Sequence, residues 1–113
     1  MIEKNLENKL KKYLKSRNIF FIKTFGNGIQ KKGLPDIIFT YKNCFFAIEL
    51  KLSKNKVSLV QKGQILNIIK SKTDYVFIID EENIDRFIAL LEEENYEKII
   101  WFSKESLKKY RII

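Results

Sequence analysis

Two nearly continuous apolar segments, residues 34–39 and 45–52, flank the dipeptide Lys42-Asn43. Runs of this kind are typical of strands that are buried on both faces. The short polar connection predicts that the two runs pair as a hairpin. Three charged side chains interrupt the runs: Asp36, Glu49 and Lys51. Charges in such a setting need an oppositely charged partner or a metal ion.

The other apolar patterns alternate between strand and helix periodicity, which predicts an α/β fold with a mixed sheet flanked by helices. A chain of 113 residues with 45% hydrophobic residues forms one domain with a single core. Ser58 with Gln61 predicts a capping box. Gly63 is unfavourable in the helix that follows and suggests contact with DNA or with another helix. We expect strands at 19–25, 36–41, 44–52, 75–79 and, at the sheet edge, 98–102, and helices at 2–16, 58–71, 82–94 and 103–110.

Several chemistries are excluded by composition. The chain has no histidine and one cysteine, Cys44, so an intrachain disulfide, a zinc site rich in Cys or His, and histidine acid–base catalysis are absent. No apolar stretch reaches the roughly 18 residues that suggest a membrane span. The first residues lack the apolar region of a signal peptide, so we expect an intracellular, cytoplasmic protein.

Charge is unevenly distributed along the chain. The first 72 residues contain 16 lysines or arginines and only four carboxylates, whereas the last 41 contain six basic and ten acidic residues. Such asymmetry predicts a basic surface whose partner is nucleic acid or an anionic membrane. A general abundance of lysine is the simpler alternative, but it does not explain why the acids gather in the last third.

The charged residues of the hairpin can form a metal site. Side chains alternate along a strand, so Glu49 and Lys51 point to one side while Leu50 points into the core. Hairpin pairing brings Asp36 beside the end of the Glu49 strand. Two carboxylates, with a backbone carbonyl from Leu50, suit Mg²⁺ or Mn²⁺, and Lys51 can orient a water or contact a phosphate. A structural ion pair is the alternative.

The motifs at residues 33–36, 49–51 and 58–61 resemble those of the PD-(D/E)XK nuclease superfamily. Within it they are most similar to the VRR-NUC group, as are residues 2–10 and 21–25. The resemblance implies a restriction-endonuclease-like αβββαβ core over about residues 3–88. Residues 89–113 would be an extension within a single domain of residues 1–113. Whether Trp101 and Tyr110 in this extension pack on the core or form a subunit interface is left open.

The resemblance also implies a role for particular residues. It assigns catalysis to Asp36, Glu49, Lys51 and Gln61, and metal binding to Glu7, Asp36, Glu49 and Leu50. A glutamate of the first helix completes the metal site in this family. Glu7 matches best and Glu3 is the alternative, because both lie on the same shoulder of the helix. Gln61 would lie near the site, or serve only the capping box.

A set of lysines around the hairpin is expected to contact DNA: Lys23, Lys31, Lys32, Lys54 and Lys56. The resemblance implies an Mg²⁺-dependent endonuclease that cuts branched DNA, particularly Holliday junctions, as a homodimer, and it suggests a phage-encoded protein. Two alternatives remain at this point. One is a sequence-specific restriction or homing-like endonuclease, and the other is an inactive nucleic-acid-binding domain.

Overall fold

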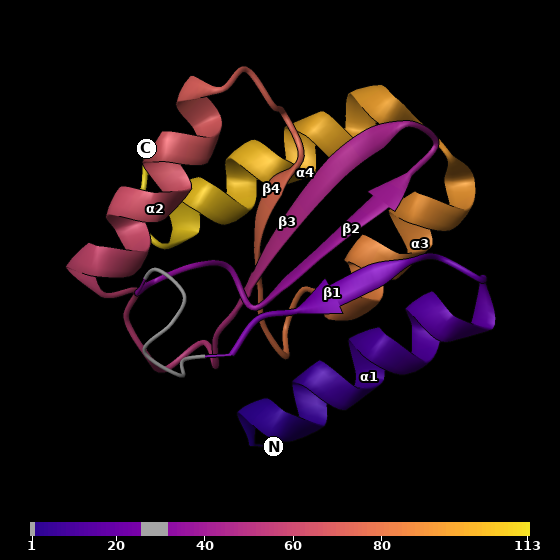
Figure 1. Ribbon diagram of the computed structural model, residues 1–113, viewed down its shortest axis with the longest axis horizontal. Coiled ribbons are helices and arrows are strands. Elements are labelled where there is room, and N and C mark those ends of the chain that lie inside the picture. Colours follow the sequence, from indigo (N-terminus) through magenta and orange to yellow (C-terminus); the bar gives the residue numbers. More distant parts are fainter. Residues whose placement is uncertain (1, 26–31) are drawn as a thin grey trace.

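The computed structural model describes residues 2–25 and 32–113 (Figure 1). Most of the predicted glycine loop lies outside these ranges. Four strands and four helices are formed within them, and their order confirms the predicted αβββαβ core. The elements are α1 Glu3–Ser16, β1 Phe21–Lys23, β2 Ile37–Tyr41, β3 Cys44–Leu50, α2 Leu59–Lys70, β4 Val76–Ile79, α3 Ile84–Glu93 and α4 Tyr96–Lys109.

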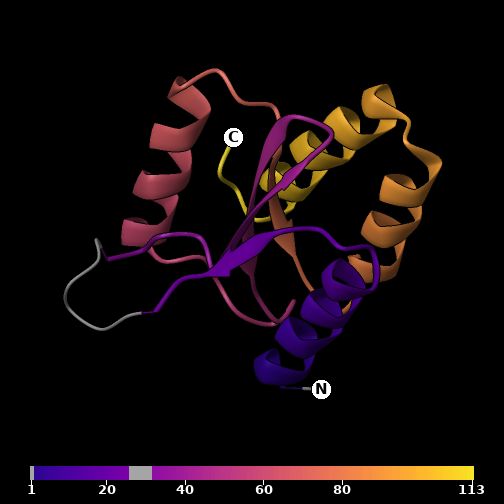
Figure 2. The ribbon, with the colours of Figure 1, turned by 45° about the vertical axis from the view of Figure 1, so that its right-hand side comes forward.

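The strands form one mixed sheet in the order β1-β2-β3-β4. The first three strands run antiparallel to one another, and β4 is parallel to β3. A two-residue turn joins the antiparallel strands β2 and β3, whereas the parallel pair β3–β4 requires a crossover, and α2 provides it. The predicted α/β class, with helices on both faces of the sheet, is confirmed (Figure 2).

The β2–β3 hairpin closes through Lys42 and Asn43, which both have positive φ values, 50° and 67°. Positive φ at both central residues is the geometry of a two-residue hairpin turn whose twist matches that of the strands. Asn43 tolerates this conformation well, whereas Lys42 does so only at a cost. The turn fixes the register, in which Tyr41 pairs with Cys44 and Ile37 with Ile48.

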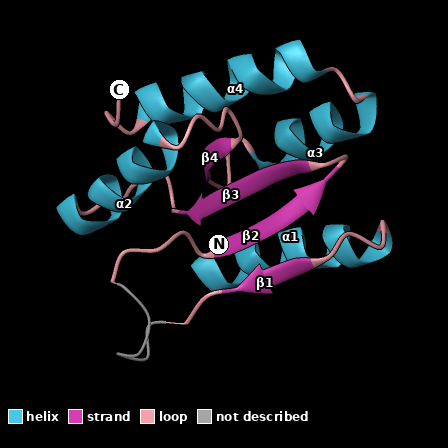
Figure 3. Ribbon diagram, turned by 45° about the horizontal axis from the view of Figure 1, so that its top comes forward, coloured by secondary structure: helices cyan, strands magenta, loops and turns pink. Residues whose placement is uncertain are grey.

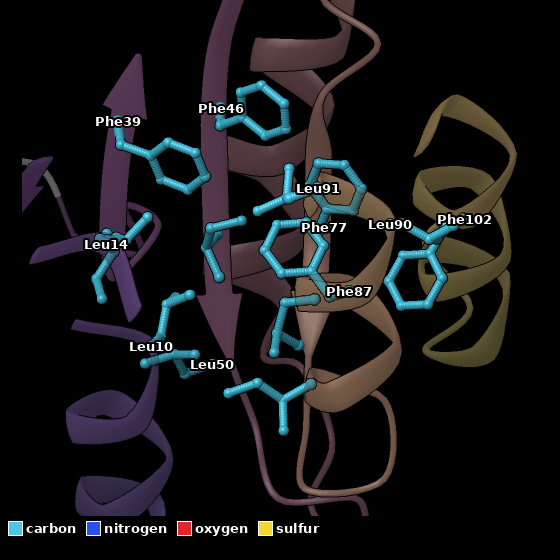
Figure 4. Packing of buried hydrophobic residues seen from close by; sticks show 14 of the residues in the cluster. Leu10, Leu14, Phe39, Phe46, Leu50, Phe77, Phe87, Leu90, Leu91 and Phe102 are labelled. Atoms are coloured by element: carbon cyan, nitrogen blue, oxygen red, sulfur yellow. The ribbon is translucent and has the colours of Figure 1, made fainter. Parts of the chain in front are cut away.

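One face of the sheet carries the larger core cluster, to which α1, α3 and the first half of α4 contribute (Figure 4). The rings of Phe39 and Phe46 stack with centroids 4.8 Å apart, and Phe46 continues the stack to Phe77 at 5.7 Å. Leu10 and Leu14 of α1 are fully buried against this face. A smaller cluster on the opposite face joins Ala47 and Ile78 to Ile65 of α2 and to Leu107 and Ile112.

The strand predicted at residues 98–102 is wrong, because this segment and residues 103–109 form the single helix α4. The segment was predicted as a strand because its run of Ile, Trp and Phe has high β propensity. The buried positions Ile99, Phe102 and Ser106 recur at helical spacing instead. Asn95 caps the helix by accepting a hydrogen bond from the backbone N–H of Lys98 at 3.2 Å.

The helix α4 takes the place at the sheet edge that the predicted strand would have occupied (Figure 3). Ser106 Oγ accepts a hydrogen bond from Ile78 N at 3.1 Å, and Ser103 Oγ donates to the carbonyl of Val76. These two hydroxyls satisfy backbone groups that a further strand would otherwise pair. The segment therefore packs on the core, although Trp101 itself is 56% exposed.

Gly33 shapes the approach to β2. Its φ is +77°, and a Cβ atom on it would lie 2.7–2.8 Å from the side chain and backbone of Val60 in α2. Only glycine fits a position that combines left-handed φ with such close contact. The glycine thus allows the segment before Asp36 to pass directly against the first turn of α2. Gly63 differs, because a Cβ atom there would meet no described atom within 4 Å.

Gly33→Ala and Gly63→Ala should change the free energy of unfolding in opposite directions. Gly33→Ala should destabilise the fold by at least about 1–2 kcal/mol, since it adds backbone strain and a clash with Val60. Gly63→Ala should stabilise it by about 0.5–1 kcal/mol, because alanine favours the helix. Urea unfolding of both variants measures this. A destabilising Gly63→Ala would show that this position is contacted from outside the described residues.

Candidate active site

Asp36 and Glu49 lie together at the open end of the β2–β3 hairpin, opposite its turn. Ile37 pairs with Ile48, so Asp36, one residue before the strand, lies across from Glu49. The backbone N–H of Leu50 donates a hydrogen bond to Asp36 Oδ2 at 2.8 Å, which orients the aspartate. The side chain of Asp36 is 26% exposed, whereas Glu49 is 2% exposed. The two predicted acidic residues therefore share one site at this open end of the β2–β3 hairpin, where Glu49 is buried and Asp36 is partly exposed.

Glu49 is held in an environment that disfavours its charge. Burial raises the pKa of Glu49 to about 9, and the negative charge of Asp36 adds to the effect, while Lys51 acts against it. Its Oε1 atom is buried without a hydrogen-bond partner in the described structure. A buried carboxylate oxygen without a partner is costly unless a cation or a proton occupies its place.

Gln61 connects α2 to this carboxylate. Its Nε2 donates to Glu49 Oε2 at 2.9 Å. Its Oε1 accepts from Ser58 N at 3.0 Å, and its own N–H donates to Ser58 Oγ at 3.1 Å. The predicted capping box is confirmed, and the same side chain also contacts the acidic site. Gln61 thus takes part in the cap at the start of α2 and also binds Oε2 of Glu49. Oε1 is then the only oxygen of this carboxylate without a partner in the described structure.

Lys51 lies just beyond β3, where its backbone N–H donates to the carbonyl of Ile79 at 3.0 Å. Its positive charge partly offsets the raised pKa of Glu49 and the raised pKa of Glu3. Ile48 and Leu50 belong to the larger core cluster, whereas Ala47 belongs to the opposite one. Successive side chains of β3 therefore point to opposite faces of the sheet, as expected.

The two glutamates of α1 have different surroundings. Glu7 forms ion pairs with Lys4, Lys11 and Lys23 at 3.0, 2.9 and 3.5 Å. Burial acts to raise the pKa of Glu7, but hydrogen bonds from Lys11 and Lys4 outweigh it and lower the pKa to about 2. In Glu3, burial and then the charge of Asp36 raise the pKa. The negative charge of Asp36 therefore acts on the pKa of Glu3, whereas Glu7 is surrounded by lysines.

Lys23, predicted to contact DNA, turns toward the carboxylates. Its Nζ lies 3.5 Å from Glu7 Oε1 and 3.8 Å from Asp36 Oδ1, and its side chain is only 20% exposed. It therefore bridges α1 and the start of β2 through its charge. Of the other lysines predicted to contact DNA, three are exposed at the surface: Lys32, Lys54 and Lys56. The fourth, Lys31, lies outside the described residues.

The donor set fits a hard divalent cation. Within residues 2–25 and 32–113, no three His, Cys, Asp or Glu side chains gather closely enough to hold a metal by themselves. Two adjacent carboxylates with one unpartnered buried oxygen suit Mg²⁺, which keeps several waters and takes one or two protein carboxylates. The proximity of Asp36 and Glu49 was predicted from the sequence, and their binding of a metal stays a prediction. The ion pairs of Lys4 and Lys11 with Glu7 were not predicted, although their i,i+3 and i,i+4 spacing on α1 is a readable signal.

The family model of the archaeal Holliday junction resolvases (Hjc) matches residues 2–75, which include α1, the hairpin and α2. The chain belongs to this family. Holliday junction resolvases of this kind are structure-specific, metal-dependent endonucleases of the PD-(D/E)XK superfamily, and the predicted activity on branched DNA is confirmed. No curated protein and no solved structure matches the chain.

The family match supports the superfamily but not the VRR-NUC group in particular. It also covers the whole of the acidic site, because Asp36, Glu49, Lys51 and Gln61 all lie within residues 2–75. Among the helices in the described part of this resolvase, none is long and apolar enough to cross a membrane.

The raised pKa of Glu49 should make the metal-free resolvase lose stability as pH rises. A carboxyl group binds its proton more tightly in the folded than in the unfolded chain when its folded pKa is raised. Unfolding therefore becomes easier between the unfolded value of 4.5 and the folded value of about 9. Glu49→Gln should remove this loss, and near pH 8 it should be more stable than the wild type by on the order of a few kcal/mol.

Urea unfolding of both proteins in EDTA, from pH 5 to pH 9, measures the difference. Glu105→Gln, at an exposed position of α4, controls for the loss of one surface carboxylate. Parallel curves for the wild type and Glu49→Gln across this range would show that Glu49 is already ionised in the folded protein.

Proposed function

We propose that this resolvase cleaves Holliday junctions with Mg²⁺, or Mn²⁺, bound between Asp36 and Glu49, and that Lys51 is its catalytic lysine. The observation that carries this proposal is the buried, unpartnered Oε1 of Glu49 beside Asp36 and Lys51. A bound divalent cation supplies a water of lowered pKa and neutralises charge on the scissile phosphate.

The protein groups around that position have separate tasks. Leu50 N–H fixes one oxygen of Asp36, which leaves the other to face the cation. Gln61 fixes Oε2 of Glu49, so its Oε1 is presented in a single orientation. The carbonyl of Leu50 is the third protein ligand in this proposal. Lys51 contacts the phosphate and orients the attacking water, because it follows Glu49 by two residues and its charge acts on that carboxylate.

A glutamate of α1 completes the site in the proposal. Motif resemblance favours Glu7, whose contacts with Lys23 link it to Asp36. Glu3 is the alternative, and its electrostatic interaction with Asp36 and Lys51 supports it. In either case Lys23 links α1 to the site through its ion pairs with Glu7 and Asp36. The exposed lysines Lys32, Lys54 and Lys56, together with Lys31, serve the DNA backbone.

A homodimer is proposed because junction resolution requires a cut in each of two strands related by approximate two-fold symmetry. An apolar surface on β1–β3 is available for it: Phe20, Ile22 and Phe45 are 71%, 46% and 44% exposed. They line a shallow pocket of about 60 Å³ on the sheet face that also carries α2. A second copy of the chain covers this surface in the proposed dimer.

Motif resemblance further supports a VRR-NUC grouping and a phage-encoded protein acting inside a host cell.

Lys51→Ala should reduce junction cleavage by at least about a hundredfold while junction binding is retained. Labelled four-way junctions and matched linear duplexes, incubated with Mg²⁺, Mn²⁺ or EDTA, measure the rates. The wild type should cut the junction in paired, symmetric positions with either metal and not in EDTA.

Glu49→Ala should abolish cleavage in the same assay and leave junction binding in EDTA unchanged, because the metal-free Glu49, with a pKa of about 9, is protonated at neutral pH and carries no charge. Glu3→Gln and Glu7→Gln, compared side by side, identify the α1 ligand by the larger loss of rate. Unchanged cleavage by Glu49→Ala would refute the proposed metal site.

A Phe20→Ser, Ile22→Asn double variant should dissociate the dimer, which otherwise has twice the 13.5 kDa mass of the chain. Loss of well-buried apolar anchors at an interface costs about 2 kcal/mol or more. Sedimentation velocity at micromolar concentration measures the species. Trp101→Ser, on the exposed side of α4, is the matched control and should leave the dimer intact. A monomeric wild type would contradict the prediction.

A further inference from the structure

A pocket of about 430 Å³ lies between α2 and the end of α4, outside the acidic site. Figure 2 shows the end of the chain returning to this place between the two helices. Three segments form the pocket: the loop after β3, the first turn of α2, and residues 109–111. Its lining is Ser53, Asn55, Lys56, Val57, Leu59, Lys62, Lys109, Tyr110 and Arg111.

The charged side chains that line the pocket are basic, and three carboxylates, Asp80, Glu81 and Glu82, lie behind them. Four of the described residues that line it are cationic, and none of them is acidic. Lys109 is neutralised by Asp80 at 2.6 Å and Glu82 at 2.8 Å. The other three, Lys56, Lys62 and Arg111, take part in none of the ion pairs among the described residues. Three unneutralised like charges around one hollow repel one another, and an anion placed among them relieves that repulsion.

Arg111 is held at the pocket by its two neighbours. The hydroxyl of Tyr110 donates to the fully buried Asp80 at 2.6 Å, and Ile112 is 5% exposed in the smaller core cluster. Between these anchors Arg111 adopts a left-handed φ of 59°. This conformation is unfavourable for a residue other than glycine, so the surrounding contacts impose it. The backbone of Arg111 is thereby held in one conformation beside the pocket.

The pocket begins close to the catalytic lysine. Ser53 lines it and follows Lys51 by two residues, which span at most about 7 Å of chain. Glu81 fixes Ser53 by accepting hydrogen bonds from its N–H at 2.8 Å and its hydroxyl at 2.6 Å. The first turn of α2 separates the two sites, since Gln61 faces Glu49 while Lys62 lines the pocket.

We propose that this pocket binds a backbone phosphate of the junction DNA, a few nucleotides from the phosphate that is cut. The inference rests on the junction-cleaving function of the family and adds to it a contact from Arg111, which lies beyond the matched residues 2–75. Successive phosphates of one strand are about 3.4 Å apart along the duplex axis, so a pocket this close to Lys51 receives a near neighbour.

The lining favours a nucleic-acid backbone over a small free anion. Lys56 and Arg111 are exposed side chains around a hollow that is open to solvent, and Leu59 at its rim is 87% exposed. A small free anion is bound tightly by buried, converging donors, whereas exposed lysines and arginines act by releasing counterions from a polyanion. The DNA backbone is therefore the occupant that matches this chemistry.

Arg111→Gln and Lys62→Gln test the pocket through the affinity for a fluorescent four-way junction in EDTA, where no cleavage takes place. Each should raise the Kd by roughly three- to tenfold and reduce the slope of log K against log salt by about 1, the contribution of one phosphate contact. The matched control is Lys104→Gln, an exposed lysine of α4 that does not line the pocket, and it should change neither quantity.

Three outcomes would overturn the proposal. One is a Kd and salt slope of both pocket variants equal to those of the wild type. A second is an equal loss in Lys104→Gln, which would show that only net charge matters. The third is calorimetric binding of inorganic phosphate that Arg111→Gln abolishes without any change in junction affinity, which would assign the pocket to a free anion. Junction cleavage by the wild type is measured separately, so each of these results would leave the nuclease activity standing.

Discussion

The register of the β2–β3 hairpin is the constraint on which the site depends. The turn at Lys42 and Asn43 pairs Ile37 with Ile48, and this pairing places Asp36 beside Glu49 and next to the N–H of Leu50. A slip of one residue would exchange the two faces of the strand and move the glutamate into the phenylalanine core. The backbone cost of a left-handed Lys42 is therefore offset by a register that both packs the core and assembles the carboxylates.

Burial around this hairpin produces the chemistry. Glu49 has lost almost all contact with water, and its free oxygen is stabilised by neither a hydrogen bond nor an ion pair in the described structure. The same apolar packing that stabilises the sheet thus creates a position that a cation fills favourably. Gln61 shows how closely the scaffold and the site are joined, because one amide caps α2 and orients the carboxylate.

The edge of the sheet illustrates where sequence patterns fail. Residues 98–102 combine Ile, Trp and Phe, and strand propensity alone assigns them to an edge strand. In the folded protein they belong to α4, and Ser103 and Ser106 satisfy the outer backbone groups of β4. Tertiary packing overrides local propensity here because the helix buries Ile99 and Phe102 in the larger core cluster and Leu107 in the smaller one. The sequence also did not indicate the contacts of Asp80, because Lys109 and Tyr110, which bind it, lie about 30 positions further along the chain.

The sequence by itself determined the features that act over a few residues. The hairpin, the capping box of Ser58 and Gln61, and the convergence of Asp36 with Glu49 follow from turn length, cap spacing and strand alternation. Only the tertiary structure decided that Lys23 turns toward Glu7 and Asp36, and that Arg111 lies near the loop after Lys51. Those distances depend on how helices dock on the sheet, and docking is set by the packing of side chains that are far apart in the chain.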